Sequence, residues 1–197
     1  MWAGIALKKI LIAGEAGQTT NYENALAAMQ VHFVTSLQVK DVDEYDGLLL
    51  PGGGDVDPKL FGQLLIPETE IRQYSRWEQQ LIRKGQEKLT PELDRIQLAI
   101  LKAFCQYRKP VFGICKGMQL INIAFGGDML RHLPTAVHHA YREKDQMHPA
   151  RNEVNSFLYE VYGSDMLVNS AHHQGVGIPG RGIRYVQYAP DGVVEGL

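Results

Sequence analysis

Short apolar runs alternate with segments of helical periodicity over the first 125 residues of the chain. Apolar, β-prone runs predict strands at residues 9–13 and 31–35 and buried strands at residues 48–50 and 111–114. Apolar positions that recur every three or four residues predict helices at residues 21–29, 93–107 and 116–125. This alternation predicts an α/β fold with a mostly parallel central sheet flanked by helices, and functional groups where the strands end.

The remaining segments have a weaker pattern. Residues 58–91 are rich in charged side chains and glutamine, and apolar positions at helical spacing around Trp77 predict one peripheral helix there. Beyond about residue 128, strands are predicted at residues 167–169 and 185–188, followed by a turn at residues 190–192.

Composition narrows the choice of partners. A chain of 197 residues fits one domain with one core, and its formal net charge of -2 with no dense Lys/Arg cluster argues against nucleic acid. No apolar run approaches the ~20 residues that span a bilayer, so no membrane partner is expected. Two cysteines are too few for a disulfide framework, which favours a cytoplasmic location. A small-molecule partner remains, and the sequence leaves a homodimer open.

Cys115 lies at the predicted junction of a strand and a helix, between Gly113 and Gly117. This is the pattern of a nucleophile elbow, in which the glycines allow close backbone packing around a strained turn. The N–H groups and dipole of the following helix favour a thiolate over a thiol. An isolated cysteine is more often structural, and Cys105, which lacks these flanking features, keeps that interpretation. Cys115 is the predicted nucleophile.

A run of glycines ends the preceding predicted strand, at residues 51–54. In a parallel sheet this run emerges at the same edge as Cys115. Its bare N–H groups, with the N–H of Lys116, predict an oxyanion hole in which each donor is typically worth about 3 kcal/mol. Most glycine runs are simple turns, so it is the combination with Cys115 that favours this function.

Seven histidines compete for the role of general base. His138, His139 and His148 fall in a charged stretch without clear pattern, and no cysteine or carboxylate at a known ligand spacing accompanies them. A surface loop is therefore predicted there, and no metal site. Residues 169–174 instead follow an apolar run with five polar side chains in six positions, which is typical of a binding loop.

Four ordered blocks resemble one family, the γ-glutamyl-γ-aminobutyrate hydrolase branch of the class I glutamine amidotransferases. They are PGGGDVDP at residues 51–58, GICKGMQ at 113–119, VNSAHHQ at 168–174 and APDGVVE at 189–195. The resemblance implies the flavodoxin-like fold of that superfamily in a single domain over residues 1–197. It also implies Cys115 as the nucleophile, an oxyanion hole at the Gly53/Gly54 loop and the Lys116 N–H, and no cofactor.

The resemblance further implies how substrate is held. Gln119 contacts the glutamyl end of the substrate, and the loop that carries Ser170, His172 and His173 contributes to the same binding site. Lys116 stands where arginine is more usual in the family, a change that keeps the backbone donor of the oxyanion hole.

One departure from the family concerns the general base. Its members take a catalytic His and Glu from a Trp/Gln-His-Pro-Glu motif that follows the Asp-Gly-Val-Val-Glu block, and these 197 residues contain no His-Pro-Glu. The expectation is a domain that lacks its C-terminal His/Glu segment, with His172 or His173 as the alternative base.

The predicted reaction is hydrolysis of a γ-glutamyl amide through a γ-glutamyl thioester on Cys115, with release of glutamate and an amine. Two alternatives stay open. The first is a glutaminase domain that delivers ammonia to a synthetase, and the second is a catalytically inactive γ-glutamyl-binding protein.

Overall fold

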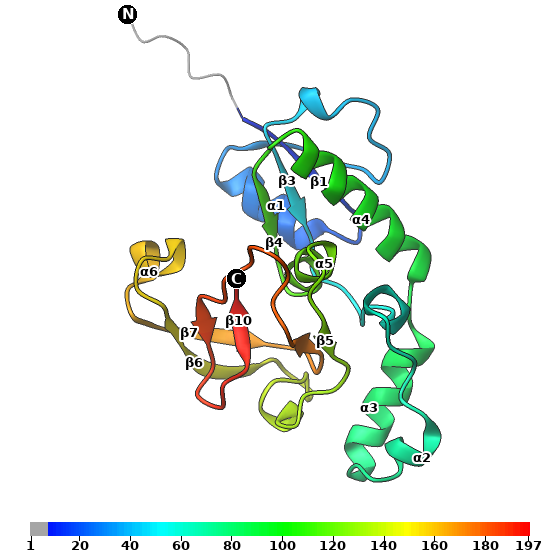
Figure 1. Cartoon of the computed structure of the whole chain (residues 1–197). Coiled ribbons are helices and arrows are strands. Elements are labelled where there is room, and N and C mark those ends of the chain that lie inside the picture. Colours follow the sequence, from blue (N-terminus) through cyan, green and yellow to red (C-terminus); the bar gives the residue numbers. More distant parts are fainter. Residues whose placement is uncertain (1–7) are drawn as a thin grey trace, which may run out of the picture. The chain divides into compact units, whose positions relative to one another are not determined.

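A computed structural model describes residues 8–197, which form two compact units (Figure 1). The first unit contains the chain up to Val56 together with Thr90–Ala124, and the second contains Asp57–Leu89 together with Phe125–Leu197. No helix in the described part of the chain is long and apolar enough to cross a membrane.

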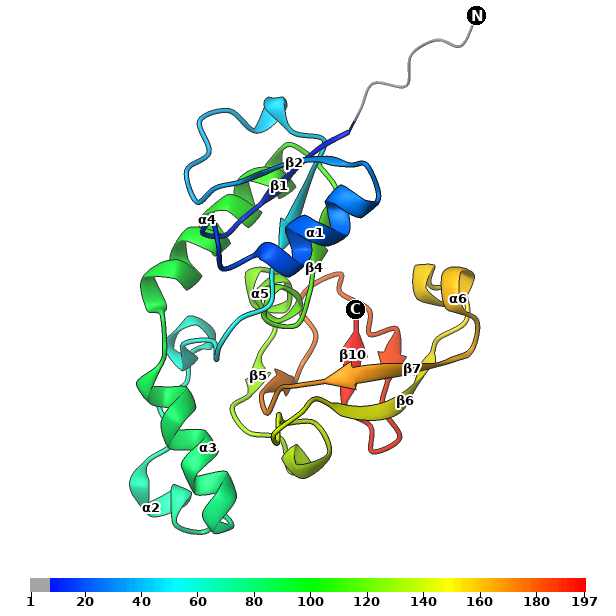
Figure 2. The same ribbon diagram turned by 180° about the vertical axis from the view of Figure 1, so that it is seen from behind.

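The first unit is built on a parallel sheet of four strands in the order β2-β1-β3-β4. The connection from β1 through α1 leads to β2 at one edge of the sheet, and the connection from β3 through α4 leads to β4 at the other edge. Because both crossovers are right-handed, α1 and α4 lie on opposite faces of the sheet. Figure 2 shows α1 in front of the sheet and α4 behind it. The elements are β1 (Lys9–Ile12), α1 (Thr20–Ala28), β2 (His32–Thr35), a 3-10 turn η1 (Val42–Glu44), β3 (Gly47–Leu50), α4 (Pro91–Gln106), β4 (Val111–Gly113) and α5 (Lys116–Ala124).

The core of the first unit lies between α4 and the sheet. Ile100, Leu101 and Phe104 lie on one face of α4 and are buried in one cluster with Leu11 of β1 and Leu50 of β3. The predicted apolar stripe includes the buried residues Ile100 and Phe104, although its last member, Tyr107, is 52% exposed, and the predicted helix is confirmed within two residues at its start. The prediction of a mostly parallel central sheet is confirmed in this unit.

Strand β4 corrects one expectation. It is the last strand in the order of the parallel sheet, paired only with β3 in the described residues, and Phe112 is 59% exposed. The prediction of a buried strand was wrong at this position. A run of four apolar residues does not distinguish a central strand from an edge strand.

The second unit is built mainly from antiparallel strands, which the sequence did not indicate. A four-stranded sheet has the order β10-β9-β6-β7, and β5 pairs with β8 (Figure 1). The elements are the 3-10 turn η2 (Pro58–Phe61), α2 (Glu68–Ile71), α3 (Arg76–Glu87), β5 (Met129–Leu130), the 3-10 turn η3 (Ala136–His138), β6 (Gln146–Asn152), α6 (Phe157–Tyr162), β7 (Asp165–Ser170), β8 (Gly175–Val176), β9 (Gln187–Tyr188) and β10 (Val194–Gly196).

Two local features of this unit bear on the sequence predictions. The peripheral helix expected around Trp77 is confirmed as α3, which begins at a capping box formed by Ser75 and Glu78. The surface loop expected at His148 is wrong, because this residue lies in β6 opposite Val168 of β7. Pro149 within β6 masked the strand, although exposed and less exposed positions alternate along it.

Candidate active site

Cys115 occupies the turn between β4 and α5 in a left-handed backbone conformation, with φ 51°. A non-glycine residue in this conformation costs about 1–3 kcal/mol and is typical of functional sites. The carbonyl of Cys115 accepts the first hydrogen bond of α5, from the Gln119 N–H at 3.1 Å, and the thiol is exposed. The strained turn predicted from the sequence is present, with the thiol at the helix N-terminus.

Close backbone contacts explain why this turn requires glycine on both sides. A Cβ added to Gly117 would collide with the carbonyl oxygen of Leu50 in β3, and one added to Gly113 would lie 2.5 Å from the carbonyl carbon of Gly117. The two glycines thus let α5 pack directly on the ends of β3 and β4, which turns Cys115 outward.

The glycine loop after β3 lies beside this elbow. The Gly52 N–H donates to the Tyr22 hydroxyl at 2.9 Å, and a Cβ on Gly52 would lie 3.5 Å from the Cβ of Cys115. A Cβ on Gly53 would lie 3.0 Å from Cδ of Lys116, whereas Gly54 has open space at that position. The structure therefore brings together Gly53 and Lys116, two of the residues predicted to form the oxyanion hole.

Lys116 contributes two different groups. It is the first residue of α5, so its N–H belongs to the helix-terminal donors that lack an intrahelical acceptor. Its side chain turns inward, where Nζ lies 2.5 Å from Oδ1 of Asp94 and donates to Oγ1 of Thr90 at 3.4 Å. Lys116 is 2% exposed and Asp94 is 0% exposed, so the ion pair is buried. Sequence reasoning did not single out Asp94, whose position in the first turn of α4 is its only local signal.

Gln119 follows Cys115 by one turn of α5 and is largely buried. Its backbone N–H is bonded to the Cys115 carbonyl, which fixes its position relative to the elbow.

Cys105 differs from Cys115 in its exposure. It is partly buried in α4 against the core, and burial raises the pKa of its thiol.

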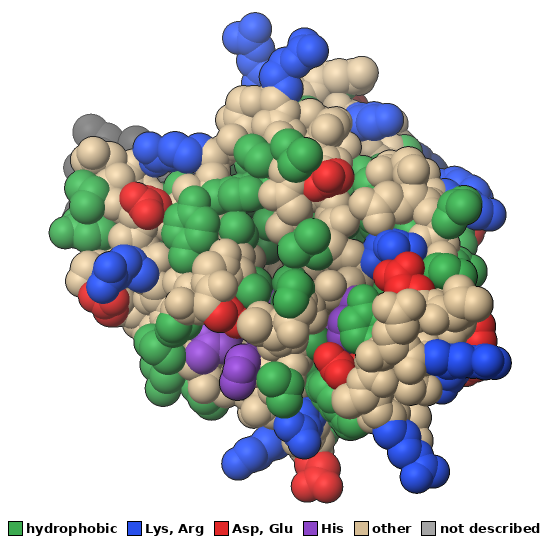
Figure 3. Space-filling view, turned by 60° about the horizontal axis from the view of Figure 1, so that its bottom comes forward, with side chains coloured by type: hydrophobic (Ala, Val, Ile, Leu, Met, Phe, Trp, Pro, Cys, Tyr) green, Lys and Arg blue, Asp and Glu red, His purple; other side chains and the backbone are tan. Residues whose placement is uncertain are grey.

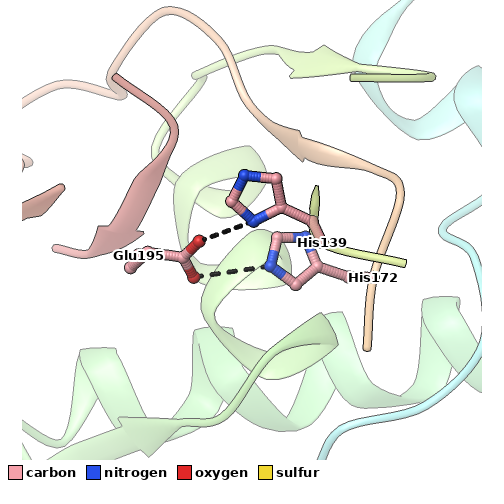
Figure 4. Close-up of side chains that lie close together, drawn as sticks. All are labelled: His139, His172 and Glu195. Atoms are coloured by element: carbon pink, nitrogen blue, oxygen red, sulfur yellow. Dashed lines mark ion pairs between the residues drawn. The ribbon is translucent and has the colours of Figure 1, made fainter. Parts of the chain in front are cut away.

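A second cluster of functional side chains lies within the second unit, around Glu195 of β10 (Figure 4). Oε1 of this carboxylate lies 3.2 Å from Nδ1 of His139 and 3.5 Å from Nε2 of His148, and Oε2 lies 3.4 Å from Nε2 of His172. His139 is 1% exposed. The surface loop expected at His139 is therefore wrong, and the group of His139, His172 and Glu195 has a geometry that could hold a metal ion.

Charges within this cluster support one another. Burial opposes the ionisation of Glu195, but hydrogen bonds from His139 and His172 outweigh it and lower the pKa of Glu195 to about 2. Burial also opposes the ionisation of Asp191, but hydrogen bonds from Thr135 and His139 lower the pKa of Asp191 to about 2. Burial acts to lower the pKa of His139, and its two carboxylate partners reverse this and raise it.

The residues of the predicted substrate loop divide between two groups. Ser170 and His172 join the Glu195 cluster, since the Ser170 hydroxyl lies 3.3 Å from Nδ1 of His139. His173 pairs with His132, with 3.0 Å between their Nδ1 atoms.

On the molecular face shown in Figure 3, little of the histidine side chains reaches the surface, and Lys and Arg side chains are scattered rather than gathered in a patch.

Comparison with known proteins decides the family. A family model described as Peptidase C26 matches residues 77–197, which include the elbow and the Glu195 cluster. The chain belongs to the peptidase C26 family. This membership confirms the resemblance to class I glutamine amidotransferases on which the sequence prediction rested.

Relatives of this peptidase C26 chain support the same assignment. Gamma-glutamyl-gamma-aminobutyrate hydrolase PuuD of Escherichia coli K12 is 28% identical over 178 residues, covering 82% of this chain and 61% of its own. Protein NtpR of Enterococcus hirae is 28% identical over 165 residues, covering 79% of this chain and 61% of its own. The chain thus spans about three fifths of the length of these relatives.

Solved structures agree on the fold. A glutamine amidotransferase from Thermotoga maritima has a TM-score of 0.62 at 12% identity, covering 95% of this chain and 70% of that protein. A glutamine amidotransferase from Methylobacillus flagellatus has a TM-score of 0.56 at 17% identity, covering 93% and 61%. These structures confirm the predicted class I glutamine amidotransferase fold.

Proposed function

We propose that this chain hydrolyses γ-glutamyl amides through a γ-glutamyl thioester on Cys115. The observation that carries the proposal is the left-handed conformation of Cys115 at the start of α5, beside a glycine loop. Such an elbow holds a nucleophile away from the backbone, with amide donors around it. The name of the Escherichia coli relative supports the γ-glutamyl group as the acyl portion and an amine as the leaving group.

The proposed reaction has two steps. In the first, the Cys115 thiolate attacks the γ-carbonyl carbon, and the N–H groups of Lys116 and of the Gly53/Gly54 loop stabilise the oxyanion. Collapse of this intermediate breaks the C–N bond, and the amine leaves with a proton. In the second, water attacks the thioester, and glutamate leaves as the Cys115 thiol is regenerated. Gln119 is proposed to contact the glutamyl end, because one helical turn places it on the Cys115 side of α5.

The general base is a separate part of the proposal. Nδ1 of His172 lies 2.9 Å from the carbonyl oxygen of Gln174, and its Nε2 lies 3.4 Å from Glu195. Both nitrogens of this ring are thus engaged within the second unit, which argues against His172 as the base. Nδ1 of His173 lies within hydrogen-bond distance of Nδ1 of His132, so this ring is engaged as well. We therefore propose that a histidine other than His172 or His173, oriented by a carboxylate, activates the thiol.

Glutamate release by the full-length protein tests this function. γ-Glutamyl-γ-aminobutyrate is the first substrate, with γ-glutamyl amides of other amines as a panel. Cys115→Ala is expected to lower kcat by at least about 10⁴-fold, the loss typical for a missing nucleophile. Cys105→Ala is the matched control and should keep full turnover. Turnover that survives Cys115→Ala contradicts the proposal.

A second candidate is a glutaminase that supplies ammonia to a synthetase. It is favoured by relatives whose names refer to glutamine amidotransferases, including a glutamine amidotransferase-like protein of Lactococcus lactis at 30% identity over 161 residues. The two candidates share Cys115 and differ in the leaving group. If glutamine is hydrolysed with a higher kcat/KM than every γ-glutamyl amide of the panel, and a synthetase raises that rate, the glutaminase is correct.

A further inference from the structure

The cluster around Glu195 contains more potential metal ligands than a simple ion pair needs. Three imidazoles approach one carboxylate, at 3.2 Å for His139, 3.5 Å for His148 and 3.4 Å for His172. We propose that His139, His172 and Glu195, with His148 as the candidate fourth ligand, bind a divalent transition-metal ion, and that zinc is the ion that matches them best. This site lies wholly within the second unit and does not depend on the proposed hydrolysis.

The orientation of the three rings is the first argument. Each ring has its other nitrogen close to an oxygen outside the group: His139 Nε2 to Asp191 Oδ2 at 2.9 Å, His172 Nδ1 to the Gln174 carbonyl at 2.9 Å, and His148 Nδ1 to the Pro149 carbonyl at 3.0 Å. A neutral imidazole that donates one N–H presents a lone pair at its second nitrogen. Three lone pairs therefore converge on a carboxylate. Zinc-binding histidines use the same outer contacts to carboxylates and backbone carbonyls.

Unsatisfied atoms are the second argument. Nε2 of His148 and Oε1 of Glu195 are buried, and the 3.5 Å contact between them lacks the geometry of a hydrogen bond. Native proteins contain few buried polar atoms without a hydrogen bond, because no interaction then offsets the cost of removing the atom from water. A cation between the two atoms would satisfy both.

The distances fit a zinc ion. Zinc bonds to imidazole nitrogen at about 2.0–2.1 Å and to carboxylate oxygen at about 2.0–2.2 Å, which places tetrahedral ligands about 3.3 Å apart. Oε1 of Glu195 lies 3.2 Å from His139 and 3.5 Å from His148, and Oε2 lies 3.4 Å from His172. The ligand atoms of His139, His172 and Glu195 all lie within 4.8 Å of one another.

Charge and burial indicate the role of the ion. With neutral rings, a dication balances the charges of Glu195 and of Asp191, which lies on the outer nitrogen of His139. The four ligand side chains are between 1% and 16% exposed. With His148 in the fourth position the site would be closed, and a closed site of four protein ligands is typical of structural rather than catalytic zinc. The ion would tie β10 to β6 and to the loop after β7.

Zinc binding to chelator-treated full-length protein tests the site. Isothermal titration with zinc sulfate should give one ion per chain and a higher Tm for the loaded protein. Glu195→Gln and His172→Gln should each weaken binding by more than 100-fold. Asp191→Asn, which removes only an outer contact, should weaken it by about 10- to 100-fold. His138→Gln is the matched control, because His138 is exposed and adjacent to His139.

Cobalt(II) separates this site from the thiol. Bound here, it should give a tetrahedral visible spectrum without the sulfur-to-metal charge-transfer band of a thiolate ligand, and Cys115→Ser should leave that spectrum unchanged. X-ray absorption of the zinc-loaded wild-type protein should show imidazole scattering, which settles the ligands even where a variant fails to fold. Any of three results would overturn the proposal. They are a failure to bind zinc stoichiometrically, a sulfur ligand on the bound metal, and unchanged affinity in a folded Glu195→Gln variant.

Discussion

Lys116 and Asp94 form a buried ion pair directly beneath the elbow, with 2.5 Å between Nζ and Oδ1. The same residue thus offers its N–H at the start of α5 and anchors its side chain in the first turn of α4. Breaking one partner of such a pair leaves an uncompensated charge in the interior, and this typically costs about 3–5 kcal/mol.

Asp94→Asn is therefore expected to lower the free energy of unfolding by several kcal/mol, measured by urea denaturation. Glu92→Gln, in the same helical turn, is the control. Its exposed ion pair with Arg95 should change stability by less than about 1 kcal/mol. Equal effects of the two substitutions would show that the buried pair does not stabilise the unit.

Gly117→Ala should be much more destabilising than Gly54→Ala. The added Cβ at position 117 collides with the Leu50 carbonyl, whereas the one at position 54 meets nothing within 4 Å. We expect a loss of at least about 1–3 kcal/mol for Gly117→Ala and about 0.5 kcal/mol or less for Gly54→Ala. Thermal unfolding of both variants checks this, and a tolerated alanine at position 117 would contradict the close contact between α5 and β3.

The two thiols should react at different rates. Burial raises the pKa of Cys105, whereas Cys115 is exposed at a helix N-terminus that stabilises its thiolate. Iodoacetamide at neutral pH should modify Cys115 faster than Cys105, because a larger fraction of the exposed thiol is thiolate. Peptide mass spectrometry after short exposures measures both rates, and earlier modification of Cys105 would disprove the assignment of the nucleophile.

Acid should destabilise the chelator-treated protein through Glu195 and Asp191. Their pKa values of about 2 lie below the ordinary 4.5 and 3.8, so their contribution is complete above those ordinary values and is lost as the pH falls toward 2. His139 has a raised pKa, so its contribution is complete below 6.5 and is lost as the pH rises through its folded-state pKa. Stability measured from pH 2 to 9 should therefore pass through a maximum.

Glu195→Gln provides the check on this pH dependence. It should flatten the acid limb of the stability profile, because one of the two depressed carboxylates is gone. Glu153→Gln, which removes an exposed carboxylate of the same unit, should leave the limb in place. A profile that is identical in wild type and Glu195→Gln would show that the cluster does not couple protonation to folding.

The elbow could be predicted from the sequence because its causes are local. Gly113, Cys115 and Gly117 lie within five consecutive residues, and each glycine contact involves the turn itself or the neighbouring strand. The alternation of strands and helices in the first unit is visible for the same reason, since each apolar face belongs to one continuous segment.

The Glu195 cluster could not be predicted because it depends on pairing between distant segments. His148 comes close to His172 only when β6 pairs with β7, and Glu195 comes close only when β9 joins β10 to β6. No cysteine or carboxylate stands at a known zinc or iron ligand spacing from His139 or His148, so the sequence favoured a surface loop over a metal site.

The division of the chain into two units has a consequence for its synthesis. The glycine loop and the elbow lie in the same unit, yet residues 57–89, which belong to the second unit, separate them in the sequence. Translation adds about 5–20 residues per second. Gly53 is therefore synthesised seconds before Lys116. During that time β3 cannot pair with β4, which has not yet been made. The nascent chain must keep this sheet edge free of other partners until α5 is made.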